Sequence, residues 1–116
     1  MTATTDPLSF DKQPYEEYKI DFNFTGRLPP GSLTLASGTL SAVKWPVGFP
    51  GLQVDATSEV LQSTSATIVA DLFARALVKA GVHNFDYMIT CRVITDDGGK
   101  LEDDVEMHVR EKGAVS

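Results

Sequence analysis

The chain has 116 residues and a formal net charge of −6, with 42% hydrophobic and 22% charged residues. This length and composition predict one globular domain with one core and leave no room for a second. The negative charge argues against nucleic acid or an anionic membrane as the main partner, because both bind basic surfaces.

Three features of the sequence concern the compartment. The single cysteine, Cys91, excludes an internal disulfide bond and fits a reducing environment. The first residues carry neither the basic nor the apolar segment of a secretory signal. No run of residues approaches the roughly 18 apolar residues of a membrane helix. We therefore expect synthesis in the cytoplasm and no membrane partner.

Residues 1–17 predict an extended N-terminal arm, because Pro7 and Pro14 interrupt any regular element. A frayed terminus is the alternative interpretation. The large apolar residues Leu8, Phe10 and Tyr15 favour an arm that packs on its own domain or on a neighbour. The predicted organisation is thus an arm over 1–17, a β-sandwich domain over 18–112 and a C-terminal tail over 113–116.

The first part of the domain reads as a series of short strands. Residues 18–24 alternate strictly, with Tyr18, Ile20, Phe22 and Phe24 on the inward face. A turn follows at 29–31, and residues 32–47 predict two short strand pieces with a bend at 36–38. Prolines and glycines form a loop over 46–51, and residues 52–56 alternate again. Short strands separated by turns are typical of a sandwich.

Residues 66–81 fit two structures. Their apolar residues recur at the helical spacing, and Gly81 could cap a helix. The same residues also alternate as a strand, which the surrounding strands favour. The segment is interpreted as a strand over 66–73, followed by a helical turn over 75–79.

The last third of the chain predicts a β-hairpin. Two alternating runs flank the turn Asp96-Asp97-Gly98-Gly99. The first run should bury Tyr87, Ile89, Cys91 and Val93, and the second should bury Val105, Met107 and Val109. A hairpin with one apolar face must bury it against a second sheet. The fold class is therefore all-β, an antiparallel β-sandwich with an extended N-terminal arm.

The residues that could support catalysis or bind a metal are scattered. His83 and His108 are far apart, and Cys91 lies on an apolar strand face without a base beside it in the sequence. Five carboxylates surround the hairpin turn, and calcium could use such a cluster, but their spacing matches no EF-hand loop. A turn with charged flanks accounts for them. We expect no enzyme activity, no catalytic residues, no metal and no cofactor.

Several short motifs resemble small tailed-phage virion proteins of the fibre–tail adaptor type. These motifs occur in the family's order and cover most of the chain, and they are Phe10-x-Lys12-x-Pro14-x-Glu16, Tyr18-x-Ile20-Asp21-Phe22, Gly51-Leu52-x-Val54, Ala66-Thr67-Ile68, Tyr87-x-Ile89-Thr90-Cys91-Arg92-Val93-x-Thr95 and Gly99-Lys100-x-Glu102-Asp103-x-Val105. The resemblance implies an immunoglobulin-like sandwich that is assembled into a bacteriophage particle. The chain departs from the family at residues 35–47, and it is longer than the family over residues 71–85.

The resemblance implies a structural protein of the virion that binds other virion proteins at the neck or tail and forms a homo-oligomer within the particle. A capsid decoration or cement protein is an alternative, and a small carbohydrate-binding module is an alternative of another class. Partner binding is assigned to the arm and to one loop, through Leu8, Phe10, Lys12, Pro14 and Tyr15 of the arm and Trp45 and Phe49 of the loop.

Overall fold

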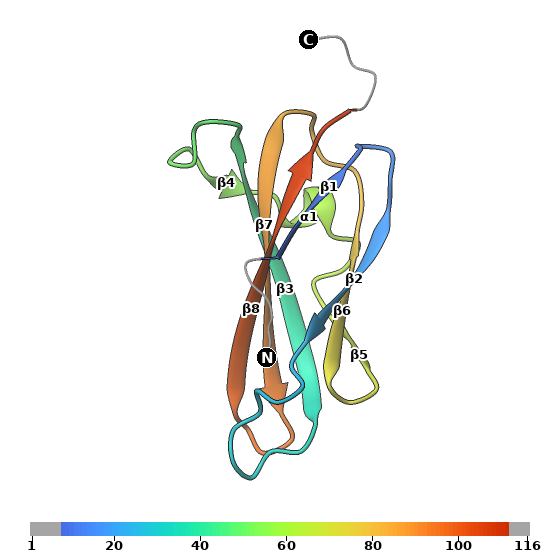
Figure 1. Cartoon of the computed structure of the whole chain (residues 1–116), viewed down its shortest axis with the longest axis vertical. Helices are drawn as coiled ribbons and strands as arrows, with labels where there is room; N and C mark the ends of the chain where they lie inside the picture. Colours follow the sequence, from blue (N-terminus) through green and yellow to red (C-terminus); the bar gives the residue numbers. More distant parts are fainter. Residues whose placement is uncertain (1–7, 112–116) are drawn as a thin grey trace.

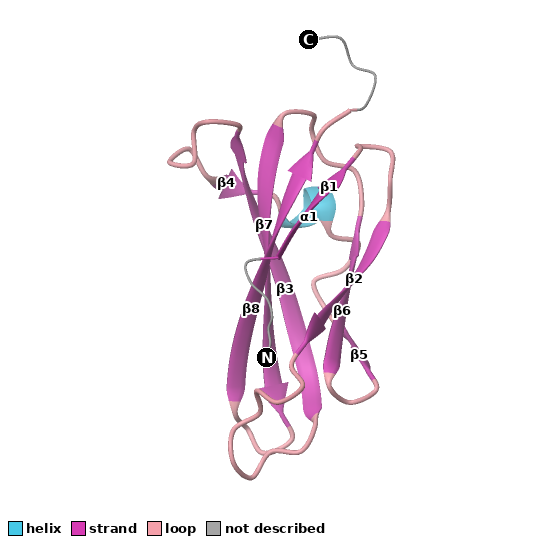
Figure 2. Ribbon diagram, viewed as in Figure 1, coloured by secondary structure: helices cyan, strands magenta, loops and turns pink. Residues whose placement is uncertain are grey.

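The alternating segments form two packed sheets in the computed structural model, which describes residues 8–111 (Figure 1). The larger sheet has the strand order β1-β8-β7-β3-β4, and the smaller has the order β2-β6-β5. The elements in chain order are β1 (Leu8–Lys12), β2 (Tyr18–Asn23), β3 (Leu35–Pro46), β4 (Val54–Asp55), α1 (Thr57–Val60), β5 (Thr67–Val69), β6 (Phe73–Val78), β7 (Phe85–Thr95) and β8 (Lys100–Val109). Apart from the one-turn helix α1, these residues form strands, turns and loops (Figure 2).

The strand order is that of an immunoglobulin-like sandwich. Strands β2, β6 and β5 correspond to the B, E and D strands, and β3, β7 and β8 correspond to C, F and G of the opposite sheet. The N-terminal strand β1 runs parallel to β8, whereas the other pairs are antiparallel. The prediction of an all-β sandwich is therefore confirmed.

The closing hairpin is formed as predicted. β7 and β8 pair over most of their length, and Thr95 N donates to Gly99 O at 2.8 Å to close the turn. Every residue predicted to point inward is at most 3% exposed, namely Tyr87, Ile89, Cys91, Val93, Val105, Met107 and Val109. This face packs against the smaller sheet and contributes much of the core.

The structure of residues 66–81 differs from the strand and helical turn predicted for them. The segment forms two antiparallel strands, β5 and β6, and the predicted helical turn over 75–79 is wrong because residues 75–78 belong to β6. Ala70 and Asp71 make the connecting turn, with φ of 51° and 66°. Alternate residues of β6 are buried. Pairing with β2 and β5 therefore outweighs the helical spacing of this sequence.

Two further segments differ in detail. The two strand pieces predicted over 32–47 form one strand, β3, and the expected bend is a register shift between Leu35 and Ser37. The strand predicted over 52–56 shortens to two residues, β4, and α1 follows it. Leu52 and Val54 are exposed, at 61% and 54%, whereas Ala56 is buried.

The N-terminal arm is extended, and its residues 8–12 form an edge strand of the larger sheet. β1 pairs with the second half of β8, from Leu8 opposite Val105 to Lys12 opposite Val109. The part of the arm over residues 1–7, the side chain of Leu8 and the tail predicted over 113–116 lie outside the described residues.

Candidate interaction surface

Lys12 anchors the arm to the interior of the sandwich. Its side chain is 2% exposed, because β1 directs it to the same face as the buried residues of β8. The ammonium group donates to Gln13 O at 2.8 Å, to Pro14 O at 3.3 Å and to Ala80 O. A buried charge with carbonyl partners is far less costly than a bare one. Lys12 therefore fixes the end of β1 against the β6–β7 loop.

Burial lowers the pKa of Lys12, and the nearby carboxylates Glu16 and Glu17 act in the opposite direction. Lys12 and Pro14 thus have internal contacts in this structure, and Phe10 is partly buried against the core. The ring of Phe10 meets Tyr18 edge-on, with centroids 5.9 Å apart. Of the arm's proposed contact residues whose side chains are described, Tyr15 is the exposed one, at 95%.

Tyr15 lies in a tight turn between β1 and β2. Gln13 N donates to Glu16 Oε1 at 2.8 Å, and Glu16 N donates to Gln13 O at 3.0 Å. These bonds close the turn on both sides of Pro14 and Tyr15. The ring is therefore presented to solvent on a backbone that is already ordered.

The loop over residues 46–53 consists of two successive turns. Phe49 N donates to Pro46 O at 2.9 Å, and Leu52 N donates to Phe49 O at 3.0 Å. Gly48 has a φ of 88°, which the third position of a type II turn requires. Val47 N also donates to Asn84 O at 3.1 Å, which ties this loop to the β6–β7 loop.

Trp45 and Phe49, the two residues proposed for this loop, have different environments. Trp45 is buried at 7% exposure, opposite Asp86 of β7. Phe49 is 59% exposed at the tip of the loop. Trp45 thus offers little surface to a partner, whereas Phe49 is exposed.

A polar network links β3, α1 and β7 to the β6–β7 loop. Lys44 Nζ lies 2.7 Å from Glu59 Oε1, and the hydroxyl of Tyr87 donates to Glu59 Oε2. The same hydroxyl accepts from Val82 N at 2.8 Å. Burial would raise the pKa of Glu59, but the hydrogen bonds from Lys44 and Tyr87 outweigh it and hold the pKa below its usual value. Burial and the Glu59 contact raise the pKa of Tyr87, so its hydroxyl remains a donor.

Exposed apolar side chains gather at this end of the sandwich. The β1–β2, β3–β4 and β6–β7 loops are all at the upper end in Figure 1, with the β6–β7 loop between the other two. Of the nine large hydrophobic residues that are exposed among those described, six come from these loops and from β4. We call them the apolar end surface: Tyr15, Val47, Phe49, Leu52, Val54 and Val82. Apolar residues gathered in this way are typical of a contact surface.

Sequence reasoning identified Tyr15 and Phe49 and missed the other four residues. Leu52 and Val54 were assigned to a strand, because their alternation resembles one. The glycines and prolines around them were the signal for a loop, and β4 is only two residues long.

A cluster of charged residues lies on the outer face of the larger sheet. Asp86 Oδ1 is 2.7 Å from His108 Nδ1 and 2.8 Å from Arg110 Nη2. Burial would raise the pKa of Asp86, but hydrogen bonds from His108 and Arg110 outweigh it and lower the pKa. His108, which the sequence left without a neighbouring ligand, is half-buried and paired with Asp86. The pairing of β7 with β8 brings these residues together. Because Asp86 and His108 are far apart in the sequence, no local pattern indicated this contact.

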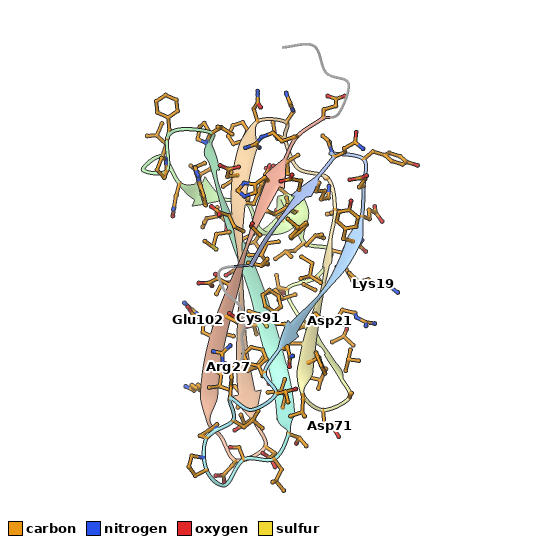
Figure 3. All side chains as sticks on the ribbon, viewed as in Figure 1. Lys19, Asp21, Arg27, Asp71, Cys91 and Glu102 are labelled. Atoms are coloured by element: carbon orange, nitrogen blue, oxygen red, sulfur yellow. The ribbon has the colours of Figure 1, made fainter. Side chains whose placement is uncertain are left out.

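The carboxylates of the closing hairpin have structural contacts. Asp96 Oδ1 accepts from Leu33 N at 3.0 Å, and Glu102 pairs with Arg92 at 2.8 Å. Arg27 reaches both Asp103 and the carbonyl of Glu102, and Figure 3 labels Arg27 and Glu102 on neighbouring parts of the fold. Within residues 8–111, three or more His, Cys, Asp or Glu side chains nowhere gather as a metal site would require.

Two other features have limited chemistry. Cys91 is fully buried inside the sandwich (Figure 3), and burial together with Asp103 raises the pKa of its thiol to about 12. The thiol is therefore protonated at neutral pH. An open groove of about 380 Å³ crosses the larger sheet, and it is lined by residues 37–39, 92–94 and 100–102. Its side chains include the Arg92–Glu102 ion pair and the half-exposed Ile94.

No protein-family model matches the chain, and no match to a curated protein is found. Within the part of the chain that the structure describes, no helix has the length and apolar character to span a membrane.

Proposed function

We propose that this protein is a non-enzymatic structural subunit of a bacteriophage virion that binds other virion proteins at the neck or tail through the apolar end surface. The proposal combines the motif resemblance in the sequence with one structural observation. That observation is the presence of Tyr15, Phe49 and four aliphatic side chains on three loops and β4 at one end of the sandwich.

The loops are suited to binding because they are held in place before a partner arrives. The hydrogen bonds from Lys12 to three carbonyl oxygens fix the β1–β2 loop, and the bond between Tyr87 and Val82 N holds the β6–β7 loop. The β3–β4 loop is tied to the β6–β7 loop by the bond from Val47 N to Asn84 O. Ordered loops lose little conformational entropy on association, so more of the apolar burial contributes to affinity. Aromatic anchors such as Tyr15 and Phe49 are enriched among the residues that dominate binding energy.

Capsid decoration is the alternative location within the same class, and the same surface would serve it. The carbohydrate-binding alternative depends on exposed aromatic platforms, with Trp45 and Phe49 as its candidates. Trp45 is 7% exposed, so Phe49 alone of this pair could stack on a sugar. The burial of Trp45 therefore favours protein binding over sugar binding.

Purified particles of a phage whose genome carries this gene would test the proposal. We expect mass spectrometry to find the chain at a fixed ratio to the tail proteins, and immunogold labelling to mark the neck or tail. Label spread over the capsid would favour the decoration alternative and contradict the neck or tail location. A chain present in infected cells but absent from washed particles would overturn the proposal.

A pair of variants connects this result to the apolar end surface. Phe49→Ser removes an exposed aromatic from it, and Leu33→Ser removes a 77% exposed residue from the β2–β3 loop at the opposite end. Both should fold like the wild type, because surface substitutions usually have small effects on stability. We expect only Phe49→Ser to reduce incorporation into particles. Equal incorporation of both variants would place the contact elsewhere.

A further inference from the structure

The smaller sheet ends in an edge strand, β2, whose outward main-chain groups can be identified. Phe24 N donates to Leu72 O at 3.0 Å, and these residues are directly opposite in the register that places Asn23 opposite Phe73. Hydrogen-bonded pairs alternate along an antiparallel ladder. The even-numbered residues of β2 therefore bond to β6, and the main-chain groups of Lys19, Asp21 and Asn23 point away from it.

Edge strands usually carry protection against pairing with other chains, such as prolines, bulges, inward charges or a very short length. The other described edges show such features. β4 has two residues and β5 has three, and β1 directs Lys12 inward. The half of β8 that β1 does not cover carries three consecutive carboxylates, 102–104. β2 has six residues without a proline or a register shift, and its inward residues are Tyr18, Ile20 and Phe22.

We propose that β2 pairs with β2 of a second copy of this chain, antiparallel and about a two-fold axis, to form one continuous sheet of six strands. The charges along the strand select both the partner and the register. When Ile20 faces Ile20 of the second copy, Lys19 faces Asp21 of that copy and Asp21 faces its Lys19. Figure 3 labels Lys19 and Asp21 along β2, and both are exposed.

The neighbouring registers are unfavourable for the same outward groups. Shifting one strand by two residues keeps the outward main-chain groups of both strands facing each other, but it sets Asp21 opposite Asp21 of the second copy. The same shift in the other direction sets Lys19 opposite Lys19. Like charges directly opposite each other destabilise an antiparallel pair. The favoured register also places Tyr18 opposite Phe22 of the second copy, so that Tyr18, 37% exposed in the single chain, gains an aromatic neighbour.

Asp21 already binds Arg75 of β6, with Arg75 Nε 2.8 Å from Asp21 Oδ1. Pairing with a second copy would continue this row as Arg75, Asp21 and then Lys19 of the second copy, with alternating signs across three strands. A carboxylate has lone pairs for both cations. The inference does not depend on the assignment to a virion.

Sedimentation equilibrium of the whole chain and two charge variants tests the proposal. The wild type should show a monomer–dimer equilibrium. Lys19→Asp sets two carboxylates opposite each other at both pairs, and Asp21→Lys sets two ammonium groups opposite each other. Each variant should therefore lower the association constant about tenfold or more, since two pairs become repulsive. An equimolar mixture of the two should form a heterodimer, because the chain with two acidic residues then faces the chain with two basic ones.

Controls separate association from folding. Asp21→Lys also removes an exposed ion pair with Arg75, which a folded domain tolerates, and circular dichroism checks each variant. Glu111→Lys, an exposed charge reversal outside β2, should dimerise like the wild type. A wild type that remains monomeric at millimolar concentration, single variants that associate normally, or a mixture that remains monomeric would each overturn the proposal.

Amide hydrogen exchange supplies a second readout at the level of single residues. The amides of Ile20 and Phe22 bond to β6 and should be protected at every concentration. The amides of Lys19, Asp21 and Asn23 should exchange rapidly in dilute solution and gain protection as the concentration rises. Protection of these three amides that does not change with concentration would contradict pairing through β2.

Discussion

The hydroxyl of Tyr87 donates a hydrogen bond to the carboxylate of Glu59, 28 residues earlier in the chain. The same oxygen accepts from Val82 N, which gives β7 the corner that immunoglobulin-like sandwiches form where a tyrosine near the start of strand F bonds back to the preceding loop. Through this one side chain the fold ties α1, β7 and the β6–β7 loop together beneath the apolar end surface.

Tyr87→Phe should reduce the free energy of unfolding by about 1–3 kcal/mol, because it leaves Glu59 and the amide of Val82 each short of a buried partner. Urea denaturation followed by fluorescence measures the loss. Tyr15→Phe is the matched control, since its ring is 95% exposed and the same change should stay within about 0.5 kcal/mol. Equal effects at both positions would show that the corner contributes nothing specific.

Glu59→Gln should make the free energy of unfolding depend less on pH in the acidic range. The pKa of Glu59 is lowered in the folded protein, so the folded state binds fewer protons than the unfolded state, whose pKa is near 4.5. The stabilisation is therefore fully present above about pH 5 and is lost as the pH falls through the lower, folded pKa.

The measurement for Glu59→Gln is urea denaturation at pH 7 and pH 3. The difference between wild type and variant should be larger at pH 7 and should shrink at pH 3. Ser58→Ala, a change at a neighbour that does not titrate, should keep the pH dependence of the wild type. A difference that stays constant with pH would mean that the charge of Glu59 is not what stabilises the fold.

Lys12→Met should destabilise the fold by about 1–3 kcal/mol, although methionine is apolar and fits a buried site. The change removes the donor from the carbonyls of Gln13, Pro14 and Ala80. Hydrogen exchange should also accelerate at Arg110 N, which bonds to Lys12 O at the end of β1. Lys100→Met, at an exposed position, is the control. A similar loss of stability there would show that the hydrogen bonds from Lys12 to the three carbonyls contribute nothing specific.

Substitutions in the turn between β5 and β6 should stabilise the protein. Ala70 and Asp71 both have positive φ, and for residues other than glycine this conformation costs roughly 1–2 kcal/mol each, with Asn and Asp penalised less. The pair Ala70→Asn and Asp71→Gly supplies the residues that such a turn prefers, so stability should rise by about 1 kcal/mol.

Thermal denaturation measures the effect of this double change. Gly98→Ala supplies the opposite control, because Gly98 has a φ of 85° and open space where a Cβ would lie, so only the backbone conformation is penalised. That variant should lose about 1 kcal/mol. A destabilised Ala70→Asn/Asp71→Gly protein would show that the native turn carries no strain.

The segments of the chain differ in how strongly local signals indicate their structure. The β7–β8 hairpin was predictable because the alternation and an Asp-Asp-Gly-Gly turn agree. The β5–β6 hairpin was not, since Ala70-Asp71 is an atypical turn pair and the apolar residues around it also recur at helical spacing. Leu52 and Val54 alternate like a strand, but Leu52 lies in the loop and the strand that contains Val54 has only two residues. Tyr15 and Phe49 were identifiable as candidates, whereas the burial of Trp45 and Lys12 depends on neighbours that are distant in the sequence.

By itself the sequence determined an all-β sandwich, the inward faces of β2, β7 and β8, and the position of the closing turn, because these depend on side-chain alternation and turn residues within a few positions. Only the tertiary structure decided that β1 joins the larger sheet, that the Lys12 ammonium group meets three carbonyl oxygens, and that three loops and β4 bring six apolar side chains to one end. Those outcomes depend on which strands pair, and pairing is a property of the whole chain that no local pattern encodes.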